Sequence, residues 1–83
     1  MKELKVQQYF GYDAEKEMKN GRVRRCRVLV TLYEGGVASV HLITDSSKKN
    51  LCDAKNRKEA RKIYWNQRHK HIELDYDIVS DFG

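Results

Sequence analysis

The clearest pattern in the chain is an alternation of apolar and polar residues that recurs in separate segments. Residues 72–78 alternate strictly, and residues 23–33 form a longer run rich in valine and leucine. Near the N-terminus, Leu4, Val6, Gln8 and Phe10 alternate with Lys5, Gln7 and Tyr9. A period of two places alternate side chains on one side of an extended chain, so each segment is predicted to be a strand. Residues 37–44 follow Gly35-Gly36 and are expected to return as the second arm of a hairpin.

The Gly35-Gly36 pair also predicts which side chains share a face of this hairpin. Read as a two-residue loop, it places one set of side chains together: Leu29, Tyr33, Ala38, Val40 and Leu42. The opposite set is Val28, Val30, Leu32, His41 and Ile43. Both faces are then partly apolar, and the one that does not meet a helix needs a cover from the N-terminal segment, a partner or a second copy of the chain.

Residues 13–20 have two interpretations. Asp13 can cap a short helix that ends before Gly21, or Asn20-Gly21 can be the two-residue loop of a hairpin. The hairpin is favoured because a helix of seven residues is too short to persist without good packing. It would place Glu17 opposite Arg24, a favourable pair of charges.

The second half of the chain predicts one main helix. Asn56 and Glu59 match a capping box, and the helix is expected to run to about Arg68. Residues 45–55 are predicted to be a polar connection in which Leu51 and Cys52 point inward. The expected fold class is α+β, with a small antiparallel sheet in the order β-β-β-α-β and the helix packed on one face. Residues 1–83 form a single domain.

One side of this helix combines a tryptophan with cations. At about 100° per residue, one arc contains Arg57, Lys58, Arg61, Lys62, Trp65 and Arg68. Ala60, Ile63 and Tyr64 lie on the opposite arc. The cations can follow a row of phosphates while Trp65 stacks on an unpaired base. The same arc also fits a contact with an acidic protein, or a solvated face whose long side chains cover Trp65.

Further cations lie outside the helix. The chain has a net charge of +5, and residues 22–27 contain four arginines. Arg25 and Arg27 share one strand face and can bind phosphates or carboxylates bidentately, although charges of this kind also protect an edge strand from aggregation. Lys48 and Lys49 lie in the expected connection and are candidate contacts. Residues 71–83 carry only acidic charges, so the surface is expected to be dipolar.

No pattern in the sequence indicates catalysis, a metal or a cofactor. The glycine pair is a turn rather than a phosphate loop, and neither cysteine has a histidine beside it in the sequence. Cys26 and Cys52 are interpreted as reduced thiols of a cytoplasmic protein. His69 and His71 are expected at the helix C-terminus. Glu73, Asp75 and Asp77 are better explained as a solvated strand face than as a Mg²⁺ site.

These patterns lead to two functional hypotheses. The first is a small, non-catalytic module that contacts nucleic acid through the basic helix face and the arginine-rich strand. The second is an accessory protein of a phage or other mobile element that inhibits or adapts an acidic or nucleic-acid-binding protein. A homodimer is compatible with both. No run of about 18 apolar residues is present, so no membrane contact is expected, and Met1–Leu4 contains no apolar start of a signal peptide.

Overall fold

Five strands form one antiparallel sheet, and a single helix separates the fourth strand from the fifth. The computed structural model describes residues 5–83. The elements are β1 (Val6–Glu17), β2 (Val23–Tyr33), β3 (Ala38–Thr44), β4 (Lys48–Ala54), α1 (Arg57–Glu73) and β5 (Asp77–Phe82). The α+β class is confirmed. The first predicted strand begins at Leu4. Met1–Leu4, the segment considered for a signal peptide, lies outside the described residues.

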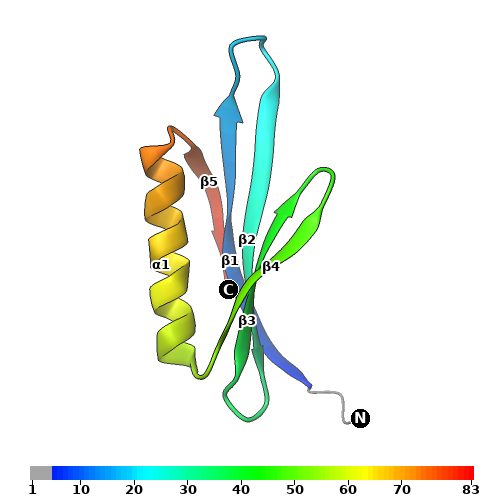
Figure 1. The fold of residues 1–83 in the computed structure, drawn as a ribbon, viewed down its shortest axis with the longest axis vertical. Helices are drawn as coiled ribbons and strands as arrows, with labels where there is room; N and C mark the ends of the chain where they lie inside the picture. Colours follow the sequence, from blue (N-terminus) through cyan, green and yellow to red (C-terminus); the bar gives the residue numbers. More distant parts are fainter. Residues whose placement is uncertain (1–4) are drawn as a thin grey trace.

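The strand order across the sheet is β4-β3-β2-β1-β5. Strands β1 to β4 follow one another as antiparallel hairpins, and β5 returns after α1 to pair with the other side of β1. Figure 1 shows α1 standing beside the sheet, with the tip of the β3–β4 hairpin on the opposite side of the view. The first and last strands of the chain therefore meet beside the helix.

The β1–β2 hairpin is the correct interpretation of residues 13–20, but its predicted register is wrong. The amide of Met18 donates to the Arg22 carbonyl (2.7 Å), and the amide of Gly21 donates to the Met18 carbonyl (2.9 Å). The loop therefore has three residues and ends with Gly21 at φ +82°, a conformation that glycine adopts without strain. As a result Lys16, rather than Glu17, lies opposite Arg24.

The β2–β3 turn differs from the prediction in the same way. The amide of Tyr33 donates to the Val37 carbonyl (2.9 Å), which makes Glu34-Gly35-Gly36 a three-residue loop. Val30 then pairs with Val40, and Leu32 pairs with Ala38. A shift of one residue moves a whole set of side chains to the other face. The predicted grouping of Leu29 with Val40 is therefore wrong.

The buried hydrophobic side chains of the sheet gather on one face, which we call the inner face. It consists of Tyr12, Ala14, Cys26, Val28, Val30, Leu32, Ala38 and Val40. Ala54 and Ala60 complete the core, and the partly buried Ile63 and Tyr64 of α1 pack against it. The outer face carries Tyr9, Leu29, Tyr33, His41 and Ile43. Of these Tyr9 is 51% exposed and the other four are half-buried.

The expected order β-β-β-α-β is wrong because a strand replaces the predicted polar connection. Asp45-Ser46 makes a tight turn in which the amide of Thr44 donates to the Ser47 carbonyl (2.8 Å). Lys48–Ala54 then pairs with β3 as an edge strand. Its lysines and Asn50 hide the strand pattern, since an edge strand needs only main-chain pairing and tolerates charged side chains. Leu51 and Cys52 are half-buried, as predicted.

The start of α1 is confirmed, but its predicted end is wrong. The Asn56 side chain accepts a hydrogen bond from the Glu59 amide (2.8 Å), as an N-cap should. The helix continues past Arg68 to Glu73 and is followed by Asp75 at φ +66°. Ile72 is consequently helical, and the last strand begins at Asp77 rather than at residue 72. Alternation over residues 72–78 therefore spans the helix end and the turn after it.

Candidate functional site

The cations proposed from the sequence lie in three separate places. Arg25 and Arg27 are on β2, Lys48 and Lys49 begin β4, and the remaining candidates are on α1. Lys48 and Lys49 are exposed, and they follow the hairpin tip that Figure 1 places away from α1. The structure therefore does not join all ten candidates into one surface.

The two candidate arginines of β2, Arg25 and Arg27, are already bound to carboxylates of β1. Arg25 Nε lies 3.0 Å from a carboxylate oxygen of Glu15. Arg27 donates twice to Asp13, at 2.6 Å from Nε and 3.1 Å from Nη2. Its guanidinium also lies 5.0 Å from the Phe82 ring centroid. These ion pairs neutralise Arg25 and Arg27, and hydrogen bonding to Asp13 raises the pKa of Arg27.

On the side of α1 that contains Trp65, one cation is paired with a carboxylate and the others are not. Arg68 Nη2 lies 3.2 Å from Asp81 Oδ2, and only 24% of its side chain is exposed. By contrast, no carboxylate within residues 5–83 lies in ion-pair range of Arg57, Lys58, Arg61 or Lys62. On the opposite arc, Ala60 is buried, and Ile63 and Tyr64 are half-buried against the core. Apart from Lys70 in the last turn, the unpaired lysine and arginine side chains of α1 therefore lie in its N-terminal half.

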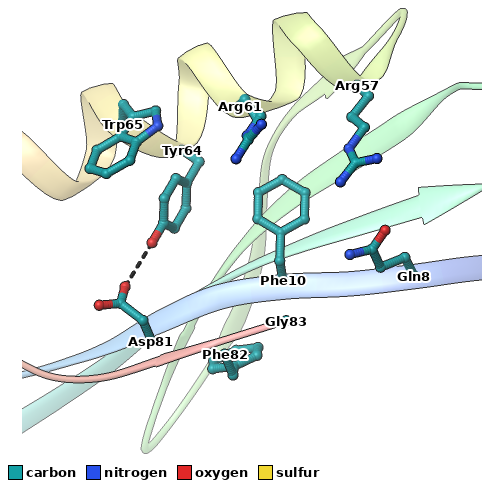
Figure 2. A pocket seen from close by; sticks show the side chains of 9 residues that line it. All are labelled: Gln8, Phe10, Arg57, Arg61, Tyr64, Trp65, Asp81, Phe82 and Gly83. Atoms are coloured by element: carbon teal, nitrogen blue, oxygen red, sulfur yellow. Dashed lines mark hydrogen bonds between the residues drawn. The ribbon is translucent and has the colours of Figure 1, made fainter.

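A groove of about 320 Å³ opens between this half of α1 and the neighbouring strands. Its lining consists of Gln8, Phe10, Arg57, Arg61, Tyr64, Trp65, Asp81, Phe82 and Gly83. Figure 2 shows Arg61 directed at the Phe10 ring and Arg57 directed toward Gln8, both pointing from α1 toward β1. Lys58 and Lys62 are exposed and do not line the groove.

Aromatic rings form much of this groove. Tyr64 makes edge-to-face contacts with Phe10 (centroids 5.5 Å apart) and with Trp65 (5.3 Å). Trp65 is 48% exposed, and the Arg68 guanidinium lies 5.4 Å from its ring centroid. The predicted exposure of Trp65 is confirmed, although the indole also packs on its neighbours along α1.

One end of the groove holds a hydrogen-bonded carboxylate. The Tyr64 hydroxyl donates to Asp81 Oδ1 (2.7 Å; Figure 2), and Arg68 donates to Oδ2. The Tyr64 hydrogen bond, followed by that of Arg68, lowers the pKa of Asp81. Burial, followed by the hydrogen bond to Asp81, raises the pKa of Tyr64. The Arg68–Asp81 pair is neutral as a whole, so Arg57 and Arg61 give the groove its positive charge.

A second group of polar side chains lies inside the core. Cys26 Sγ is 3.4 Å from His71 Nε2, while His71 Nδ1 is 2.7 Å from the Tyr12 hydroxyl and 3.0 Å from the Gln67 carbonyl oxygen. Burial, and then the charge of Asp13, raises the pKa of Cys26, so the thiol stays protonated. This favours a structural role over a nucleophilic one. Both cysteines are free, and residues 5–83 contain no group of three or more His, Cys, Asp or Glu side chains suited to a metal.

Comparison with protein families, curated proteins and solved structures finds no match for this chain. In the described part of the chain, no helix combines the length and apolar character needed to cross a membrane. The groove residues that the sequence did not propose as contacts are Gln8, Phe10, Tyr64, Asp81, Phe82 and Gly83. The pairing of β5 with β1 brings Asp81 and Phe82 to the groove, and no local pattern predicts that pairing.

Proposed function

We propose that this protein is a non-catalytic nucleic-acid-binding module whose contact surface is the N-terminal half of α1 and the groove beside it. The observation that carries the proposal is the combination of unpaired Arg57 and Arg61 with the half-exposed Trp65 on one groove. Phosphates are the anions that rows of arginine and lysine bind with release of counterions. Aromatic rings beside them provide sites on which bases stack.

The position of these charges along the helix supports an anionic ligand. Arg57 and Lys58 occupy the first turn of α1, and Glu59 is the acidic residue there. The N-terminus of a helix carries a partial positive charge, which makes nearby cations unfavourable by a few tenths of a kcal/mol or more. A bound phosphate would relieve this repulsion. The cations thus lie where they add little to folding and much to anion binding.

The experiment compares two double variants with the same change in charge. Arg57→Glu with Arg61→Glu should weaken binding of a labelled oligonucleotide at least tenfold. It should also flatten the plot of log K against log salt by about 1.4 for a single strand, since each lost phosphate contact removes about 0.7. Lys48→Glu with Lys49→Glu is the control on the remote hairpin and should change binding much less. Glutamate at position 57 suits the helix dipole, so the first variant should melt no lower than wild type.

The proposal fails if neither single-stranded nor double-stranded oligonucleotides bind at low salt. It also fails if the two double variants lose equal affinity, because binding would then follow net charge alone. A cytoplasmic location belongs to the same proposal, since the free thiols of Cys26 and Cys52 suit a reducing compartment.

The outer face favours a second candidate function, an accessory protein that inhibits or adapts a protein partner, of the kind phages and other mobile elements encode. A hollow of about 690 Å³ there is lined by Tyr33, Val37 and His41, among others. Val37 is 38% exposed, and His41 Nδ1 is buried without a hydrogen-bond partner in the described residues. Protein contacts of this type depend less steeply on salt than phosphate contacts.

The same surface would serve a homodimer. Sedimentation at high micromolar concentration should then detect a species of twice the chain mass, and Val37→Lys should reduce it. A single species with the mass of one chain argues against the dimer.

A further inference from the structure

Arg57 and Arg61, the two arginines that line the groove, point from α1 into the groove and toward β1. Figure 2 shows both guanidinium groups lying over β1, where the Phe10 side chain and Gln8 face them. Lys58 and Lys62, by contrast, are exposed outside the groove. A ligand that satisfies Arg57 and Arg61 must therefore enter the space between α1 and the β1 edge.

The geometry points to a binding site for one unpaired nucleobase in this groove, so that the nucleic acid recognised is single-stranded. The inference rests on the proposed function and deepens it. At about 320 Å³ the groove lies at the low end of the range of small-ligand sites, about 300–1,000 Å³. That suits one base with its flanking phosphates. A duplex keeps its bases stacked and paired inside a rod, and none of them could enter such a recess.

The lining offers each part of a nucleotide a chemically suitable group. Trp65 keeps about half of its surface open for stacking, and the edge-to-face contacts with Tyr64 hold the indole in place. Arg57 and Arg61 lie one helical turn apart along the groove and can meet phosphates on either side of the stacked base. The Gln8 amide and the Asp81 carboxylate are polar groups that can pair with the edge of a base.

An acidic peptide is the competing occupant of a cationic groove. It would satisfy the two arginines, but it gains little from an aromatic lining that includes Phe10, Tyr64 and Trp65. The neighbouring Arg68 is already paired with Asp81, so it offers an acidic peptide no further cation. Charge and lining together favour a base flanked by phosphates.

Trp65 provides its own probe, because it is the single tryptophan of the chain. The full-length protein is titrated with an oligothymidylate of about 12 nucleotides, within the usual site size of about 4–16, and with a duplex of the same length. We expect the single strand to quench Trp65 fluorescence and to bind at least tenfold more tightly than the duplex. The duplex should leave the fluorescence nearly unchanged.

Three variants then test stacking through the binding of a labelled oligothymidylate. Trp65→Ala should weaken binding roughly five- to a hundredfold, the range expected for one stacked base. Trp65→Phe retains an aromatic plane and should recover most of the loss. Lys70→Ala, a change in the last turn of α1 and outside the groove, should weaken binding less than Trp65→Ala does. Circular dichroism melting of each variant shows whether the fold persists.

The outcomes separate this inference from the proposed function. Equal affinity for single strand and duplex, with no change in Trp65 fluorescence, overturns the proposed nucleobase-binding site but leaves nucleic-acid binding in place. Absence of binding to both oligonucleotides overturns the two together. Polyglutamate is the last comparison. If it binds as tightly as the oligothymidylate and quenches Trp65 equally, the groove is a general site for acidic polymers, and the proposed nucleobase-binding site is overturned.

Discussion

The sulfur of Cys26 lies 3.4 Å from Nε2 of His71, although 45 positions separate the two residues in the sequence. His71 also contacts the Tyr12 hydroxyl through Nδ1, so one imidazole ring joins β1, β2 and the last part of α1. The three side chains fix the C-terminal half of the helix against the inner face. Burial raises the pKa of both Tyr12 and Cys26, which links the stability of the fold to pH.

We predict that the protein loses stability in alkali partly through Cys26. Burial raises the pKa of this thiol above its ordinary value of 9.0, so above that pH the unfolded chain releases a proton that the folded chain keeps. The free energy of unfolding therefore falls as pH rises above 9, while the contribution is complete below it. Between about pH 8 and about pH 10, thermal melts should show a larger fall in Tm for wild type than for Cys26→Ala. Cys52→Ala is the control and should resemble wild type more closely; equal losses in all three would contradict the role of Cys26.

A second prediction concerns acid. Hydrogen bonds from Tyr64 and Arg68 lower the pKa of Asp81 below its ordinary 3.8, so its contribution to stability is present above that pH and is lost as pH falls through the lowered value. Asp81→Asn should destabilise the protein at neutral pH by less than about 1 kcal/mol, because the carboxylate is half exposed. The difference from wild type should shrink as pH falls below 3.8. A difference that stays constant into strong acid would show that lost packing, not charge, is responsible.

The third prediction tests whether Trp65 is a binding residue or a packing residue. Trp65→Ala with Arg61→Glu should abolish oligonucleotide binding while the protein stays folded, since both side chains line the groove rather than the core. A tryptophan at the centre of a contact can contribute about 2 kcal/mol or more to binding. For Trp65→Ala alone, a fall in Tm of more than about 8 °C, over about 1 kcal/mol for a domain this small, would assign Trp65 to packing. Differential scanning calorimetry provides the measurement.

Two glycines provide the fourth prediction. A Cβ at Gly11 would collide with the main-chain carbonyl oxygen of Val28, which cannot move without disturbing the β1–β2 pairing. Gly21 has open space around it, and an alanine there meets only the cost of its φ of +82°, about 1–2 kcal/mol. Gly11→Ala should therefore destabilise the protein more than Gly21→Ala in urea denaturation. If Gly21→Ala destabilises the protein more, the backbone strain at the β1–β2 turn outweighs the steric clash at Gly11.

The sequence predicts those features that depend on neighbouring residues. The Asn56 cap, the hairpin over residues 13–20 and the burial of Ala60 all follow from local spacing. The registers were mispredicted because Asn20-Gly21 and Gly35-Gly36 fit loops of two or three residues equally well, and one extra residue exchanges the faces. The carboxylates that neutralise Arg25 and Arg27 come from β1, so recognising them required the correct pairing first. The groove required still more, because Phe10 and Asp81 meet only through the sheet.

The groove also makes ligand binding a measure of how completely the chain has folded. Its walls come from the beginning of β1, the N-terminal half of α1 and the end of β5, so a folding intermediate in which β5 has not yet docked lacks the site. A ligand that binds only the complete arrangement would hold these distant segments together. At a concentration one hundred times Kd, it would add about 2.7 kcal/mol to the free energy of unfolding. Slower hydrogen exchange of β5 amides in the complex would be the direct sign of this coupling.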